Sequence, residues 1–208
     1  AEAELLWRPT PGLEIGTNVA YLNARYSEYD QVPAPFGTSI LVNDPAQLTP
    51  TVVNGVTIAP AGQRRVFAPG YDCALIPGTG GTGQPAAAFG CDIGGNAIPH
   101  SPDWTGAVFA GYDIDLGSLG TLTPFAIMTF SSSFFGQPFN SVLERQESFQ
   151  KVDLRLTWAY NENVSVQAFV NNVTDEQTIT RFVWGGGAAL QASYAPPRQW
   201  GAILSLRF

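Results

Sequence analysis

Apolar and polar residues alternate along seven segments of the chain, and residues that favour turns separate these segments. Side chains of an extended strand point to opposite faces in turn, so each segment predicts a β-strand with one apolar and one polar face. The segment 149–160 is the clearest, because Val152 and Leu154 stand on one face and Asp153 on the other. The predicted strands are 2–8, 13–29, 103–116, 121–135, 149–160, 164–173 and 198–208. Segment 121–135 is mixed on both faces, which leaves its orientation open.

The connections between these strands alternate in length. Tight turns are predicted at 9–12, 117–120 and 161–163, and longer connections at 30–102, 136–148 and 174–197. Such alternation is typical of an outer-membrane β-barrel, which has short turns at its periplasmic end and long loops at its extracellular end. The pattern therefore predicts an all-β, antiparallel up-and-down transmembrane β-barrel segment over 1–208. Regular structure is expected to stop within the long extracellular loop, 30–102.

This orientation also places the two ends of the sequence. The last strand runs towards the periplasm, so Phe208 is expected at the periplasmic rim. The first strand runs in the same direction, so Ala1 is expected at the outer end of a strand. Seven is moreover an odd number, whereas single-chain bacterial barrels have an even number of strands, from about eight upwards. We therefore expect the sequence to be part of a longer chain that completes the barrel.

Composition favours a membrane location. Charged residues make up 13% of the chain, against roughly 25% in soluble domains. No run of about 18 apolar residues occurs, which excludes a membrane-spanning helix. In a barrel strand only alternate residues are apolar, which agrees with a mean hydropathy of only +0.03. Tryptophans stand near predicted strand ends, as in the aromatic girdles of a barrel, although tryptophan at a strand end of a soluble β core is the alternative.

Charge and cysteine content limit the partners and the chemistry. A net charge of −7 argues against nucleic acid, which requires a basic surface. Two cysteines, Cys73 and Cys91, lie in the long loop, and in an exported chain they are expected to form a disulfide. The single histidine, His100, and the absence of a CxxC spacing give no metal site. No constellation of catalytic residues is present, so neither an enzyme nor a cofactor is predicted.

Several phrases of the sequence resemble the C-terminal end of TonB-dependent outer-membrane receptors. The relevant segments are FVNNVTD at 169–175, YAPPR at 194–198 and LRF at 206–208, with IPHSP at 98–102 and PGL at 11–13 upstream. The order and the spacing of these phrases agree with the family, and the match covers most of the chain apart from the long loop. Terminal Phe208 looks like the family's signal for the barrel assembly machinery.

The resemblance implies active transport across the outer membrane. Such receptors are barrels of about 22 strands, closed by an N-terminal plug domain that the TonB complex pulls open. Their ligands include ferric siderophores, haem, cobalamin and oligosaccharides. The chain contains neither the plug nor a TonB-binding segment, so it would supply about seven strands of the wall and the loops of the ligand vestibule. Its partners would be outer-membrane lipid, the rest of the barrel, the plug and a small nutrient.

Ligand contacts are expected from aromatic residues of the loops. Phe67 and Tyr71 in the long loop, and Phe182 and Trp184 in the last loop, could stack on a flat chelate or a sugar ring. Such rings can equally pack the loops against themselves. Two other functions remain open at this stage: a passive, porin-like diffusion barrel with the same strands, and a soluble all-β binding module. The transported substrate cannot be read from these segments.

Overall fold

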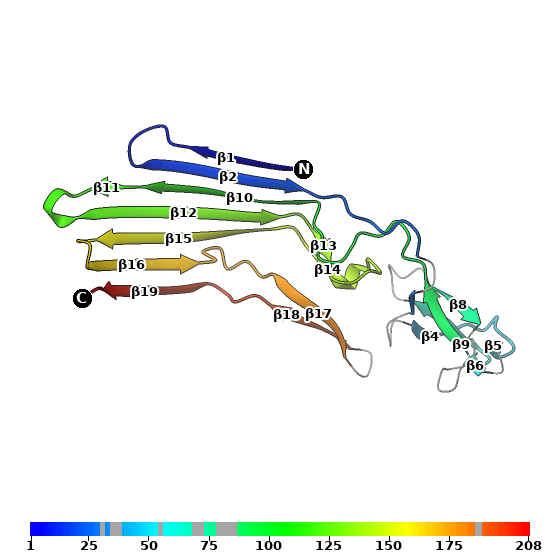
Figure 1. Cartoon of the computed structure of the whole chain (residues 1–208). Coiled ribbons are helices and arrows are strands. Elements are labelled where there is room, and N and C mark those ends of the chain that lie inside the picture. Colours follow the sequence, from blue (N-terminus) through cyan, green and yellow to red (C-terminus); the bar gives the residue numbers. More distant parts are fainter. Residues whose placement is uncertain (30–31, 34–38, 54–55, 68–72, 78–86, 186–188) are drawn as a thin grey trace.

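The chain folds into one large β-sheet with smaller β-structures attached at one end (Figure 1). The computed structural model describes residues 1–29, 32–33, 39–53, 56–67, 73–77, 87–185 and 189–208. Within these ranges, no helix is long and apolar enough to cross a bilayer.

The large sheet is an antiparallel meander. Its order is β1 (Glu2–Trp7), β2 (Leu13–Tyr21), β10 (Trp104–Tyr112), β12 (Thr121–Ser131), β15 (Phe149–Ala159), β16 (Val164–Asn171) and β19 (Gln199–Leu206). A short strand, β11 (Ile114–Asp115), pairs with the start of β12. Strands that follow one another along this path lie side by side, so the predicted up-and-down topology is confirmed, and all seven predicted strands are present.

Tight turns join the strands at one end of the sheet, at the left of Figure 1. Gly12 has a φ of +82°, which glycine adopts without strain, in the turn from β1 to β2. A 3-10 turn, η1 (Gly117–Leu119), precedes β12. The Asn161 side chain accepts hydrogen bonds from the backbone N–H groups of Asn163 and Val164 and so closes the turn from β15 to β16.

One face of the sheet is apolar almost without interruption. It comprises Ala3, Leu5 and Trp7 in β1; Leu13, Ile15, Thr17, Val19 and Tyr21 in β2; Trp104, Gly106, Val108, Ala110 and Tyr112 in β10; Leu122, Pro124, Ala126, Met128 and Phe130 in β12; Gln150, Val152, Leu154, Leu156 and Trp158 in β15; Val164, Val166, Ala168 and Val170 in β16; and Trp200, Ala202, Leu204 and Leu206 in β19. The polar members are Thr17 and Gln150. The register thus fixes the orientation of strand β12, with Met128 and Phe130 on the apolar face.

Aromatic side chains border the apolar face at both ends. Tyr21 and Trp104 are in contact near the long connections, with ring centroids 4.8 Å apart. At the tight-turn end, the Trp158 indole N–H donates a 2.8 Å hydrogen bond to the Leu119 carbonyl. Trp104 and Tyr112 mark the two levels on β10, and the strand between them is about 27 Å long. Because strands of membrane barrels are tilted by about 35–45°, this length corresponds to roughly 19–22 Å along the membrane normal, against an apolar band of about 25 Å.

The other face mixes polar side chains with aromatic rings that cover glycines. Phe109 lies against Gly16 of the neighbouring strand, so closely that a Cβ on that glycine would stand 2.2 Å from the ring. Phe169 covers Gly201 in the same way, at 2.8 Å. Phe125 stacks on Phe109, with the ring centroids 5.9 Å apart. Gly16 and Gly201 thus make room for the rings of Phe109 and Phe169 on the neighbouring strands.

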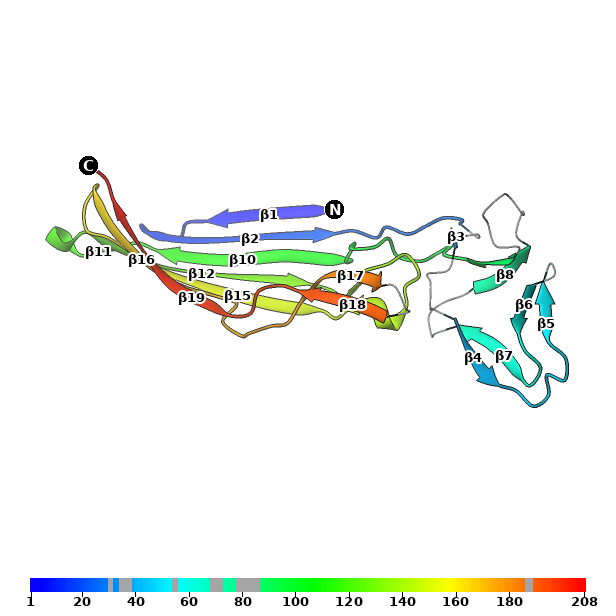
Figure 2. The same cartoon turned by 90° about the horizontal axis from the view of Figure 1, so that it is seen from below.

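The prediction that regular structure stops in the long loop is wrong. The described part of 30–102 contains β3 (Val32–Pro33), β4 (Ser39–Asn43), β5 (Thr51–Val53), β6 (Val56–Ala59), β7 (Gln63–Phe67), β8 (Cys73–Pro77) and β9 (Ala87–Cys91). They form three small antiparallel sheets, β3-β9-β8, β4-β7 and β5-β6. Figure 2 shows these strands beyond the end of the large sheet. Each is at most five residues long, too short for an alternating pattern to stand out in the sequence.

Candidate functional site

The three long connections leave the same end of the sheet, opposite the tight turns (Figures 1 and 2). The first is the long loop, 30–102. The second, 136–148, contains the 3-10 turn η2 (Val142–Glu144) and β14 (Arg145–Gln146), which pairs with β13 (Phe134–Phe135). The third, 174–197, contains the hairpin of β17 (Ile179–Gly185) and β18 (Ala189–Tyr194). These connections are the candidate functional site, because loops held by a rigid sheet commonly carry binding residues.

A small hydrophobic cluster holds the base of the long loop. Cys91 and Ile93 come from one arm of that loop, and Phe139 comes from the second connection. All three are buried, and Tyr26 and Phe67 pack against them. The second connection therefore contributes a side chain to the core of the first.

Two asparagines fasten the second connection to the long loop. The Asn140 amide nitrogen donates to the Ala97 carbonyl at 3.0 Å, and its oxygen accepts from the Ala97 N–H at 2.7 Å. The Asn96 side chain donates to the Pro138 carbonyl at 3.0 Å. Asn140 has a φ of +54°, a conformation that asparagine tolerates better than most residues. Both polar ends of the Asn140 amide are thus used in one junction.

The same connection also contacts the hairpin of the third. The Gln137 side chain donates to the Phe182 carbonyl at 3.2 Å, and the Gln146 side chain accepts from the Ile179 N–H at 2.6 Å. The Phe182 ring lies over Gly136, where a Cβ would stand 2.0 Å from the ring. Segment 136–148 therefore lies between the other two connections and is bonded to both.

Replacing Asn140 with aspartate is expected to loosen the junction to the long loop by about 1–3 kcal/mol, because a carboxylate cannot donate to the Ala97 carbonyl. Faster amide hydrogen exchange at 96–98 would report the loss. Asn161→Asp is the matched control, since the Asn161 oxygen only accepts, and aspartate preserves both bonds. Equal exchange rates at 96–98 in the Asn140→Asp variant and the unchanged protein would contradict the expectation.

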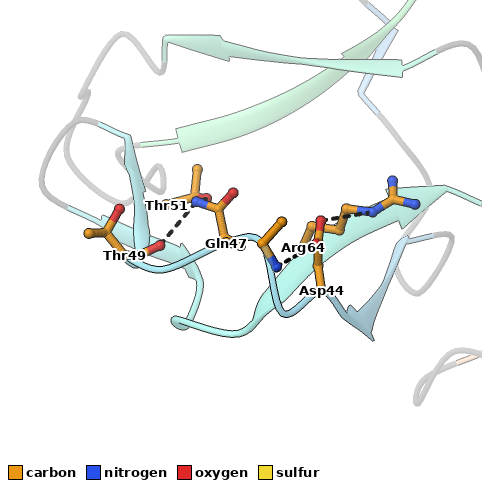
Figure 3. A network of polar contacts seen from close by, with 6 residues as sticks. Asp44, Gln47, Thr49, Thr51 and Arg64 are labelled. Atoms are coloured by element: carbon orange, nitrogen blue, oxygen red, sulfur yellow. Dashed lines mark hydrogen bonds and ion pairs between the residues drawn. The ribbon is translucent and has the colours of Figure 1, made fainter.

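The outer part of the long loop is organised around a polar turn (Figure 3). Asp44 forms an ion pair with Arg64, with Nε and Oδ2 3.4 Å apart, and this pair joins the ends of β4 and β7. The Gln47 side chain donates to the Thr49 carbonyl at 3.0 Å and to the Thr51 hydroxyl at 3.2 Å. The Arg64 side chain is 60% exposed, so this ion pair contributes little to stability.

The four predicted ligand-binding aromatics are not brought together by the described structure. Phe67 is half-buried against the cluster at the base of the long loop, and Phe182 is only 5% exposed and covers Gly136. These two rings pack the loops, which is the alternative that the sequence left open. Tyr71 and the side chain of Trp184 lie outside the described residues. A role of the four in ligand binding stays a prediction.

The structure also describes the other residues that the sequence singles out, namely the two cysteines, His100 and Phe208. Cys73 and Cys91 lie directly opposite one another in the β8–β9 ladder, and Cys91 is fully buried. His100 is exposed in a turn, and its ring lies 5.5 Å from the Phe134 ring. Phe208 follows β19 at the tight-turn end and is fully exposed. Its proposed role in barrel assembly stays a prediction.

The phrases at 169–175 and 194–198 form one structural unit where β16 ends and β19 begins. Asn172 is buried at a φ of +53°, and its side chain bonds both the N–H and the carbonyl of Glu176. The Asp175 carboxylate accepts the Arg198 N–H at 2.8 Å, and the Arg198 guanidinium donates to the Val173 carbonyl at 3.2 Å. The two phrases therefore hold the base of the third connection closed.

The residues of segment 136–148 that join the loops were not singled out by the sequence. Asn140, Gln137 and Gln146 stand in a stretch without periodicity, and nothing in their spacing indicates partners on other loops. Glu144, in the same segment, is fully buried, an unusual state for a carboxylate. Among the described residues, no three His, Cys, Asp or Glu side chains are grouped in a way that could hold a metal ion.

Comparison with known proteins agrees with this architecture. Residues 79–173 match the family described as TonB dependent receptor-like, beta-barrel. No curated protein matches the chain. Among solved structures, the ferric yersiniabactin uptake receptor FyuA from Yersinia pestis is similar over 100% of this chain and 23% of its own, with 17% sequence identity and a TM-score of 0.59. The siderophore receptor PiuA from Acinetobacter baumannii is similar over 99% of this chain and 35% of its own, with 17% identity and a TM-score of 0.44.

The chain thus spans 23–35% of the length of these receptors. At 17% identity, the likeness to FyuA concerns the fold alone, and the likeness to the family rests on the matched segment together with the strand order. The matched segment includes β10, β12, β15 and β16, the centre of the large sheet. Residues 79–173, a little under half of the chain, therefore match the β-barrel of the TonB-dependent receptor family, and the fold of the chain is similar to that of FyuA.

Proposed function

We propose that the chain is the C-terminal part of the barrel of a TonB-dependent receptor, which takes up a scarce nutrient, with a ferric siderophore as the favoured ligand. The observation that carries the proposal is the family match over 79–173. FyuA, which has a similar fold, is an uptake receptor for ferric yersiniabactin. Haem, cobalamin and oligosaccharides remain alternative ligand classes.

The two faces of the sheet support this role. In the proposal, the apolar face contacts outer-membrane lipid, and its two aromatic borders lie at the membrane interfaces. The opposite face carries Lys151, Asp153 and Arg155 on one strand, so it suits a hydrated interior or a plug domain. The TonB complex would act through that plug, which would lie in another part of the receptor. The three connections would then form the wall of the ligand vestibule.

Uptake by cells grown under iron limitation tests the proposal. A strain that lacks the gene should lose uptake of one radiolabelled ferric siderophore from a panel of several, and the unaltered gene should restore it. Uptake should also disappear when TonB is absent, because the family couples transport to the TonB complex. Uptake that persists without TonB would favour the passive porin. A protein found in the soluble fraction would favour the soluble binding module and overturn the proposal.

We also propose a disulfide between Cys73 and Cys91. Directly opposed residues of an antiparallel ladder have Cα atoms about 4.5–5.5 Å apart, within the range that a disulfide spans. The structure records no free cysteine among its described residues. Under non-reducing conditions we expect neither thiol to react with an alkylating reagent.

Removing the proposed disulfide by Cys73→Ser should destabilise the long loop by about 3 kcal/mol on the chain-entropy account. The readout is faster proteolysis within 30–102, and reduction of the unchanged protein should have the same effect. Ser118→Ala, in a tight turn at the other end of the sheet, is the control and should leave the proteolysis rate unchanged. Two thiols that react without reductant would contradict the disulfide.

A further inference from the structure

Segment 136–148 is folded as a compact loop of its own. The Gly136 N–H donates to the Glu144 carbonyl at 2.7 Å, which bonds the two ends of this loop to each other. The Ser141 side chain accepts the Leu143 N–H at 3.3 Å and so caps the turn η2. Four side chains of the segment are buried: Phe139, Ser141, Glu144 and Gln146. A loop that is closed on itself and packed by its own side chains is expected to move as one body.

The part of the long loop to which this segment is bonded is itself held together. Backbone hydrogen bonds of 2.8–3.1 Å join the two arms of the long loop, 24–29 and 93–98. The Asn140 side chain binds both backbone groups of Ala97 within the second arm. A displacement of segment 136–148 would therefore pull on both arms, and not on a single strand of loose chain.

The same segment also holds the hairpin of β17 and β18. The Gln137 side chain bonds to the Phe182 carbonyl, and the Phe182 ring is buried. The Gln146 side chain, itself buried, accepts the Ile179 N–H. Separating the hairpin from segment 136–148 would leave a buried amide without this partner, which is costly.

We infer that segment 136–148 couples the long loop to the hairpin, so that the bases of the three connections open and close as one cooperative unit. An opening that breaks one junction displaces the whole segment and so weakens the other junction. Such coupling is reciprocal, because each junction changes the stability of the other by the same free energy. In the proposed receptor, the vestibule would open in one step, and a ligand held by one connection would also stabilise the other two. The inference goes beyond uptake, since it does not depend on which ligand is bound.

Hydrogen exchange of the full-length receptor in detergent micelles tests the coupling, without a ligand and without the TonB complex. Asn140→Asp removes the donor to the Ala97 carbonyl and is expected to raise the exchange rate at 96–98 about tenfold. The rate at 179–185 should rise by a similar factor, although the hydrogen bonds of Asn140 go to Ala97 and to its own segment. A rise at 96–98 alone would overturn the inference.

The reciprocal variant alters the other junction. Gln137→Glu removes the donor to the Phe182 carbonyl and should raise exchange about fivefold at 179–185 and also at 96–98. The matched control is Gln47→Glu, the same change of amide to carboxylate in the outer part of the long loop. Its two hydrogen bonds, of 3.0 and 3.2 Å, stay within its own turn, so exchange at 179–185 should be unchanged. Equal effects of the control and the two junction variants at 179–185 would contradict the coupling.

The unaltered receptor provides a second test that needs no variant. If one opening exposes both segments, exchange at 96–98 and at 179–185 should rise with the same dependence on denaturant concentration, while β12 and β15 remain protected. Different dependences would show that the two junctions open separately, and the inference would be wrong. The result is independent of the uptake assay, which distinguishes this failure from a failure of the proposed function.

Discussion

Replacing Val108 with arginine is expected to destabilise the barrel in the membrane by about 2–4 kcal/mol, the cost of a cation at the bilayer midplane. Val108 lies on the apolar face of β10, midway between Trp104 and Tyr112, which mark the two aromatic borders. A charge at this level has neither water nor an oppositely charged partner among its neighbours on that face. The denaturant midpoint of the receptor refolded in lipid vesicles measures the loss.

The control variant carries the same charge at the neighbouring residue of the strand. Ala107→Arg introduces the same side chain on the same strand, but towards the polar face, where Asn18 and Thr129 lie beside it. This variant should keep a midpoint close to that of the unchanged receptor. If Ala107→Arg destabilises as much as Val108→Arg, the apolar face is not the lipid face.

Replacing Gly120 with alanine is the second change with a large expected effect, a loss of stability of about 3 kcal/mol or more. Gly120 has φ +86° and ψ −149°, a conformation that is essentially restricted to glycine and costs other residues about 1–3 kcal/mol. A Cβ there would also stand 2.0 Å from the Ala159 carbonyl oxygen, so the start of β12 would have to move away from the end of β15. The yield of folded receptor in the outer membrane and its midpoint in vesicles should both fall.

The variant Gly117→Ala separates the cost of backbone strain from the cost of the clash with Ala159. Gly117 lies in the same turn at φ +63°, but nothing stands within 4 Å of a Cβ built on it. Gly117→Ala should therefore cost only the backbone strain, about 1–2 kcal/mol. Similar losses in the two variants would show that contact with Ala159 does not limit this turn.

The large sheet could be predicted because apolar and polar residues alternate with a period of two residues, and this alternation is repeated over long strands. Eight to eleven residues of regular alternation, as in β15 and β16, are enough to identify a strand and its two faces. Strand β12 was ambiguous because Phe125 and Ile127 put apolar side chains on the polar face as well. Its register with β10 and β15 was needed to resolve it, and register depends on residues far away in sequence.

The loops could not be predicted in the same way. Their strands are short, and their contacts are single hydrogen bonds between distant segments, such as Asn140 with Ala97. Aromatic residues were identified as ligand contacts by type alone, yet Phe182 is buried against Gly136, which a sequence does not reveal. By contrast, the resemblance at 169–175 and 194–198 did point to residues that are bonded to each other, Asp175 and Arg198.

The rings that cover glycines would also affect the width of the proposed barrel. Because Phe109 and Phe169 lie flat against Gly16 and Gly201 of the adjacent strands, they project little from the polar face of the sheet. In the proposed barrel, a larger residue at either glycine would push the ring away from the wall and narrow the interior at that height. The clearance for a ligand, or for a plug inside that barrel, would therefore depend in part on residues that have no side chain.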